Sequence, residues 1–109
     1  MPILTNQIVT LAAIAPSYAA CAAGGDEFVN SGRDFIHIKN GHTSPQTVTV
    51  NSQTVCDQGV DHDVPVVVTN AQERMIGPFP KGRFDDTGGK VQLTYSGVVA
   101  LTIAIVRVP

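Results

Sequence analysis

The residues most able to do chemistry gather between Cys56 and Asp63, where the chain reads Cys-Asp-Gln-Gly-Val-Asp-His-Asp. Acidic residues on both sides of His62 could suggest a bound metal ion. A calcium loop, however, needs oxygen ligands at alternating positions and a closing glutamate, and that pattern is missing. A zinc site would need more Cys or His ligands at closer spacing. We therefore interpret the stretch as a solvated loop whose Asp side chains bond nearby backbone amides, and we expect no metal and no cofactor.

Other candidates for catalysis also lack partners. Asp85 and Asp86 are adjacent, so their carboxylates should diverge and not act as an acid–base pair. His37 and His42 have no obvious Ser or Cys partner, and Cys56 lacks the glycine-rich turn of a nucleophile. The sequence contains no phosphate-binding loop, dinucleotide fingerprint or zincin motif. We expect no catalytic residues and a protein that is not an enzyme.

The charge balance excludes further classes. The net charge is −2, so no basic surplus is present to hold a nucleic-acid backbone. Charged residues make up 15% of the chain, against about 25% in typical soluble domains. A surface with so few charged residues suits burial against another protein. Aromatic residues make up only 6%, which argues against a small glycan-binding sandwich.

After Gly24-Gly25 the chain is a series of short β-runs separated by turn residues, with no helical period. Six or seven short strands at this spacing predict an all-β fold, an antiparallel β-sandwich or small barrel. Pro65 predicts an edge strand or a strand start for its run. The expected strands cover residues 35–39, 47–52 with a possible extension through Val55, 64–69, 74–79, 90–96 and 98–108.

The last of these runs is apolar on both faces in its middle, which indicates a central strand or one covered by a partner. Leu101, Ile103 and Ile105 should face inward, on the same side as Val99. The opposite side holds the small residues Ala100, Thr102 and Ala104 and should lie against another layer or subunit.

The N-terminal 25 residues carry no charged side chain and show no clean sandwich register. We therefore divide the chain into an extended N-terminal arm, residues 1–25, and a β-sandwich body, residues 26–109. So much uncharged apolar area needs a surface to lie on, either its own domain or a neighbouring chain. The arm's partner-binding candidates are its large apolar residues, Ile3, Leu4, Ile8, Val9, Leu11 and Ile14.

The same N-terminal segment does not have the features of a secretory signal or of a membrane helix. A secretory signal needs a basic start, which this segment lacks, although Ala19-Ala20-Cys21 faintly matches a lipoprotein cleavage site. No stretch reaches the roughly 18 apolar residues of a membrane helix, so no membrane partner is expected. Without a secretion signal, Cys21 and Cys56 are interpreted as small, partly buried thiols in a reducing compartment.

Several segments together resemble a known family. Residues 18–33 lead through an Ala-Gly-Gly-Asp block into residues 35–41, and Arg-Met-Ile-Gly-Pro-Phe at 74–79 and Val-Gln-Leu-Thr-Tyr-Ser at 91–96 follow. With these segments the chain resembles the small head decoration, or cement, proteins of tailed bacteriophages, over nearly its whole length. The family has no catalytic residues to carry over.

The resemblance implies a structural virion protein that is made in the host cytoplasm and decorates the capsid surface in many copies. Its partners would be the major capsid protein and neighbouring copies of itself, possibly in a trimer, because a closed ring matches the symmetry of a shell. Two alternatives stay open: another virion component, such as a head–tail connector or tail protein, and a lipid-anchored periplasmic β-sandwich exposed after cleavage before Cys21.

Overall fold

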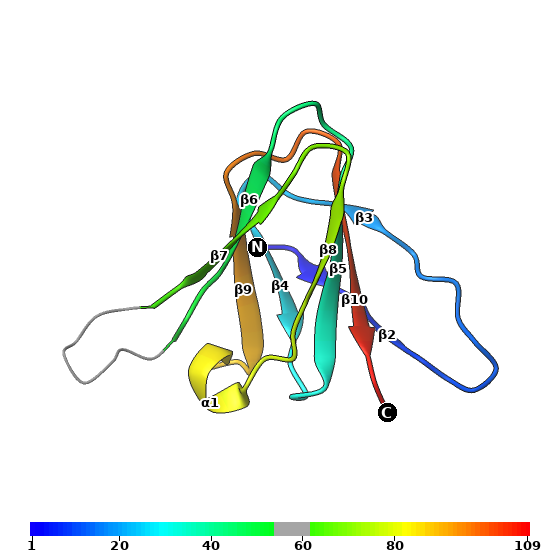
Figure 1. Cartoon of the computed structure of the whole chain (residues 1–109). Helices are drawn as coiled ribbons and strands as arrows, with labels where there is room; N and C mark the ends of the chain where they lie inside the picture. Colours follow the sequence, from blue (N-terminus) through cyan, green and yellow to red (C-terminus); the bar gives the residue numbers. More distant parts are fainter. Residues whose placement is uncertain (54–61) are drawn as a thin grey trace.

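The computed structural model describes residues 1–53 and 62–109, which form two β-sheets packed face to face and one short helix (Figure 1). Sheet A has the strand order β1-β4-β9-β6-β7; sheet B has the order β2-β10-β5-β8, and β3 also pairs with β10. The predicted all-β sandwich is therefore confirmed. The elements are β1 (Ile3–Leu4), β2 (Asn6–Ile8), β3 (Ala19–Ala20), β4 (Asp26–Val29), β5 (Asp34–Asn40), β6 (Gln46–Val50), β7 (Val64–Val68), β8 (Glu73–Ile76), α1 (Lys81–Phe84), β9 (Lys90–Tyr95) and β10 (Leu101–Arg107).

The strands β3 to β10 define the topology. They form two antiparallel layers in the orders β3-β10-β5-β8 and β4-β9-β6-β7. Strands consecutive in the chain hold matching positions in opposite layers: β3 with β4, β5 with β6, β7 with β8, and β9 with β10. This is the strand order of a jelly roll, an eight-stranded sandwich made of two Greek keys. The loops after β5, β7 and β9 cross between the layers at one end of the molecule (Figure 1).

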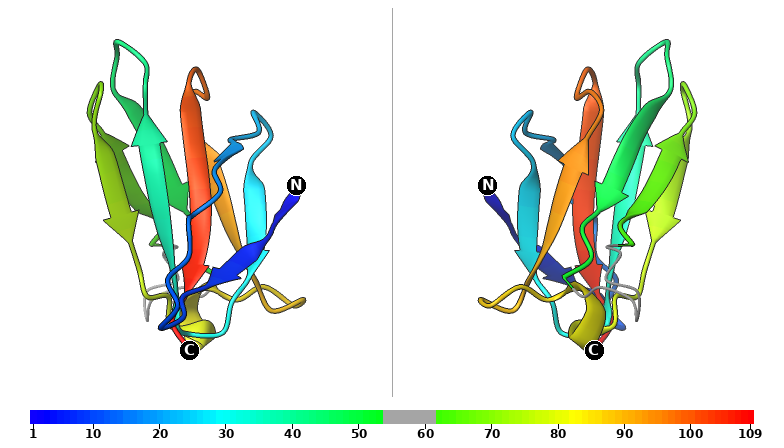
Figure 2. Two further views of the ribbon diagram at one scale, coloured as in Figure 1. Left: turned by 90° about the vertical axis from the view of Figure 1, so that its right-hand side faces the viewer. Right: turned by 90° about the vertical axis from the view of Figure 1, so that its left-hand side faces the viewer.

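The N-terminal segment adds two further strands to this framework. β1 pairs with β4 and β2 pairs with β10, both in parallel, so Thr5 carries the chain from the edge of sheet A to the edge of sheet B. Residues 9–18, which we call the strap, then pass along the outer side of β10 and lead into β3 (Figure 2). The described residues thus show no arm separate from the body; of the two expected supports for this segment, the structure shows its own domain.

The hydrophobic core lies between the two sheets. The alternation predicted from the sequence holds, because Val48 and Val50 are buried while Thr47 and Thr49 face outward. Three rings close one end of the core, with Phe79 at 5.6 Å from both Phe28 and Phe84, measured between ring centroids. The buried apolar residues are Cys21, Phe28, Ile36, Ile38, Val48, Val50, Val68, Phe79, Phe84, Val91, Leu93, Leu101, Ile103, Ala104, Ile105 and Val106.

The expected strand positions agree with the observed ones, apart from their ends. The run at 74–79 stops at Ile76, before Gly77 and Pro78, and the proposed extension of β6 through Val55 falls outside the described residues. The last strand begins at Leu101 and not at residue 98, because residues 98–101 form a turn. The prediction that Val99 faces inward is therefore wrong; its side chain is 58% exposed. Leu101, Ile103 and Ile105 are buried, as predicted.

A buried amide network joins the loops at one end of the sandwich. The Asn40 side chain donates to the carbonyl oxygens of Ser44 (3.0 Å) and Val68 (2.9 Å) and accepts from the Gln46 amide (2.9 Å). The Gln46 side chain in turn bonds both the N–H and the carbonyl oxygen of Val99. These hydrogen bonds join the loops after β5, β7 and β9 to one another. The two buried amides therefore have a structural role.

A buried carboxylate anchors the opposite end of sheet B. Asp34 accepts hydrogen bonds from the Arg107 guanidinium (2.8 Å), the Asn6 amide (3.0 Å) and both the backbone N–H and the hydroxyl of Ser31 (2.6 and 2.9 Å). Burial alone would raise the pKa of this carboxyl, but the hydrogen bonds from Arg107 and Ser31 outweigh it and hold the pKa below its ordinary value. Asn6 ties β2 into the same cluster, which explains how so short a strand is positioned.

Candidate functional site

The outer face of sheet B is partly covered by the strap. Side chains that point outward from β5 and β10 include Phe35, His37 and Val106, and they meet the strap residues Val9 and Ile14. Val106 is only 6% exposed and Ile14 is half-buried, so the strap supplies the outer layer that the small residues of β10 predicted. The chain itself thus supplies at least part of this layer.

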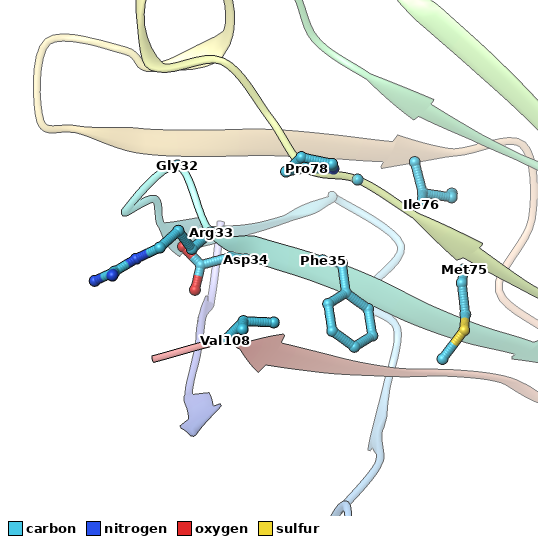
Figure 3. A pocket seen from close by; sticks show the side chains of 9 residues that line it. Gly32, Arg33, Asp34, Phe35, Met75, Ile76, Pro78 and Val108 are labelled. Atoms are coloured by element: carbon cyan, nitrogen blue, oxygen red, sulfur yellow. The ribbon is translucent and has the colours of Figure 1, made fainter. Parts of the chain in front are cut away.

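One apolar groove runs along this face beyond the strap. Its open part, about 470 Å³, lies between the start of β5, the end of β8 and the C-terminal end of the chain. Phe35, Met75 and Val108 meet there with their side chains close together, whereas Arg33 points away (Figure 3). A second cavity, about 380 Å³, lies between the strap and the sheet, and Phe35 and Met75 line both.

Gly77 makes the open part of the groove possible. Its φ of +143° is unfavourable for other residues. A Cβ built there would also lie 2.8 Å from the Cβ of Phe35. The chain can therefore leave β8 in close contact with the backbone of β5.

Polar groups fix the C-terminal end of the strap on the sheet. The Tyr18 hydroxyl lies 2.6 Å from Nδ1 of His37, and Nε2 of His37 lies 3.2 Å from a carboxylate oxygen of Glu73. A neutral imidazole with its proton on Nε2 satisfies both contacts, accepting from Tyr18 and donating to Glu73. The Lys39 ammonium stands 4.2 Å from the centroid of the Tyr18 ring, a cation–π contact. These side chains form a latch that positions the strap.

The base of the strap is held by backbone contacts. The Gln7 side chain bonds both the N–H and the carbonyl oxygen of Ser17, each at 2.8 Å, and Val9 donates its N–H to the carbonyl of Arg107 (3.0 Å). The two ends of the strap are thereby brought together, and residues 10–13 project as a turn between them.

The six arm residues chosen from the sequence divide into two groups. Leu4 and Ile14 are half-buried against their own domain. Ile3, Ile8, Val9 and Leu11 stay 60%, 50%, 37% and 110% exposed. Docking in cis therefore leaves most of the predicted partner-binding area open to solvent.

Sequence analysis missed the groove residues Phe35, Met75 and Val108. A signal was present for Phe35, because it is a large apolar residue on the outward side of its strand, where His37 and Lys39 are polar. Met75 and Val108 join it only through the pairing of β8 and β10 with β5, which no local pattern encodes.

The acidic candidates have structural roles where the structure describes them. Most of the stretch from Cys56 to Asp63 lies outside the described residues; Asp63 itself accepts the backbone N–H of Ser52 (2.8 Å). Asp85 bonds the buried amide of Asn30 (2.7 Å) and pairs with Lys81 (2.8 Å). The adjacent Asp86 makes separate contacts within its own turn and with Gln92.

Cys21 is a core residue. Its side chain is 6% exposed, and its backbone N–H donates to Leu101 (3.0 Å). Burial raises the pKa of the Cys21 thiol to about 12, with a smaller raising effect from nearby Asp26 and a lowering one from its hydrogen bond to Tyr95.

We expect Cys21 to be unreactive in the folded protein. In a Cys56→Ser background at pH 8, its reaction with a disulfide reagent should be about a thousandfold slower than that of the urea-unfolded chain, because so little thiolate is present. The absorbance of the released thiol measures both rates. Equal rates would place Cys21 at the surface and contradict its assignment to the core.

Comparisons of the chain with models of protein families, with curated proteins and with solved structures gave no match. Within residues 1–53 and 62–109, no three His, Cys, Asp or Glu side chains are grouped so that they could hold a metal ion. Across the same residues, no helix has the length and apolar character to span a membrane.

Proposed function

We propose that this chain is a structural virion protein that binds the major capsid protein in many copies and stabilises a bacteriophage shell. The observation that carries the proposal is the exposed, uncharged N-terminal segment, in which Ile3, Ile8 and Leu11 point to solvent from a well-packed jelly roll. An interaction surface needs only such complementary area, since apolar groups withdrawn from water contribute about 25 cal/mol per Å² before ordering costs.

The fold and the sequence support the same class. Jelly rolls occur in viral capsid domains and also in lectins, so the architecture alone does not choose between these uses. The resemblance of residues 18–41, 74–79 and 91–96 to phage decoration proteins favours the first use. The second has less support, because three of the six aromatic residues, Phe28, Phe79 and Phe84, are buried in the core, and among the six only Phe35 lines the open groove.

The burial of Cys21 also bears on the lipid-anchored alternative. Cleavage before this residue would remove β1, β2 and β3, together with the Asn6 contact to Asp34. It would also require a thiol packed in the core to carry a lipid. These costs favour a virion protein over a periplasmic anchor.

The test first asks whether a neighbouring gene encodes a major capsid protein, and then measures binding to shells that are assembled from that capsid protein and lack this chain. The purified chain should co-sediment at a copy number comparable to that of the capsid protein, whereas a connector or tail protein would bind in only a few copies per particle. Absence of binding would reject the proposal.

Variants then locate the surface. Ile3→Asp and Ile8→Asp should each weaken shell binding about tenfold or more, because a charge would replace an aliphatic group that is exposed in the free chain and withdrawn from water in the contact. Val67→Asp is the matched control, since Val67 is 54% exposed on the edge strand β7, away from the N-terminal segment. Equal losses for all three variants would contradict binding through the N-terminal segment.

A further inference from the structure

We propose that the turn at the tip of the strap inserts Leu11 into the open apolar groove of a second copy of this chain. The inference rests on the proposed function, which brings many copies of this chain side by side on a shell. It assigns the strap tip to a neighbouring copy and not to the capsid protein. Ile3 and Ile8 remain the surface offered to the shell.

The turn is chemically unusual for an exposed position. It is closed by the hydrogen bond from the N–H of Ala13 to the carbonyl oxygen of Thr10 (3.0 Å), which places Leu11 and Ala12 at its tip. Exposed turns normally carry Gly, Asn, Asp, Pro or Ser, because these residues favour the conformation and interact with water. Here Leu11 is fully exposed.

The backbone of the same turn is less distinctive. Ala13 has a φ of +69°, a left-handed conformation that Ala71 and Ala100 share in two other turns. The exposed leucine is therefore what distinguishes this turn. It departs from what stabilises an isolated domain, as is expected at functional positions.

The groove matches the tip in polarity. Its lining at Phe35, Met75 and Val108 is apolar, and Met75 is 68% exposed in the single chain. Val9 and Ile14 of the strap line a second cavity on the same face, together with Phe35 and Met75. Uncharged aliphatic side chains of the chain itself thus already border this surface.

The geometry of the contact determines its symmetry. The donor surface, at the strap tip, differs from the acceptor surface, at the groove, so the contact is heterologous and repeats from copy to copy. Heterologous contacts close into rings when the rotation between copies allows it. Each copy in a ring gives one strap tip and receives another, which doubles the area buried per chain and suits a small contact to a symmetric shell.

Disulfide trapping between different chains tests the contact directly. Leu11→Cys and Met75→Cys are made separately in a Cys56→Ser background, one of them with a size tag, and the two proteins are mixed and mildly oxidised. The mixture should give a disulfide-linked heterodimer at least ten times as abundant as that from Leu11→Cys mixed with Val67→Cys. Equal yields in the two mixtures would overturn the proposal.

The trapping is run free in solution and on decorated shells, so a failure of shell binding is distinguished from a failure of this contact. If the Leu11–Met75 heterodimer forms in neither setting, the contact does not exist, whatever the result of the shell-binding assay. A heterodimer in either setting supports it.

Sedimentation supplies the second measurement. Leu11→Asp should lower the association constant between copies about tenfold or more relative to the parent chain, while its urea melt stays unchanged because Leu11 is fully exposed in the single chain. If Leu11→Asp associates as strongly as the parent, the proposal is overturned. It is also overturned if the parent is monomeric in solution and the Leu11→Cys and Met75→Cys variants form no disulfide on shells.

Discussion

Asp34→Asn should lower the free energy of unfolding by about 2–4 kcal/mol at pH 7, because it removes the charge from a buried ion pair and replaces one of the two acceptor oxygens with an NH2 group that faces the donors of Arg107 or of Ser31. The side chain of Asp34 is fully buried, so water cannot replace the lost contacts. The same change should loosen β2, since Asn6 bonds the same carboxylate. Urea melts followed by circular dichroism measure the loss.

The pH dependence of the stability difference between the parent and Asp34→Asn shows whether the charge of Asp34 causes it. The pKa of Asp34 is lower in the folded protein than in the unfolded chain, so its contribution is complete above the unfolded pKa of about 3.9 and is lost as the pH falls through the folded pKa. The parent and Asp34→Asn should therefore begin to converge in stability below about pH 4 and should be closest below the folded pKa. Glu27→Gln, on the outward side of β4, is the control for loss of one charge. A difference that stayed constant down to pH 2 would mean that packing, and not ionisation, explains the effect.

Ile103→Ala should cost about 2–5 kcal/mol of unfolding free energy, the range for truncating a buried branched aliphatic side chain. Ile103 is 1% exposed in the middle of β10, where it faces the core between the sheets. For a domain with a total stability of about 5–15 kcal/mol, this is a large fraction, and the unassembled variant should aggregate readily.

Thr102→Ala is the neighbouring control for that measurement. Thr102 is half-buried on the outer side of the same strand, opposite Lys39 in the sheet register, so its truncation should cost little. Both variants are compared with the parent in urea. A larger loss for Thr102→Ala than for Ile103→Ala would contradict the register of β10.

The sheet strands were predictable because their alternation is local. Val48 and Val50 in one strand, and Val91 and Leu93 in another, repeat with the period of a pleated strand, and their partners across the sheet need not be known. β4 was not predicted, since it spans only four residues and begins with the buried carboxylate of Asp26, which interrupts the apolar pattern. The four-residue helix α1 is likewise too short to show a helical period.

The position of the N-terminal segment could not be predicted from the sequence. It depends on contacts between distant residues, such as Asn6 with Asp34 and Tyr18 with His37, and each member alone looks like an ordinary polar residue. The composition did indicate that this uncharged segment needs a surface. It could not indicate that the two parallel strands β1 and β2 bind to the body while Leu11 stays exposed.

The parallel pairing of β2 with β10 also determines how the molecule transmits mechanical force. β10 is the last strand of the chain, and β2 follows directly on the N-terminal residues. When the two termini are pulled apart, parallel strands slide along each other, so their hydrogen bonds are loaded together and not opened one after another. Tension between anchorages near the two ends would therefore meet a shear-resistant clamp, reinforced by the Arg107–Asp34–Asn6 bridge across the same strands. On the shell that we propose as its partner, such a subunit would resist stretching between its attachment points.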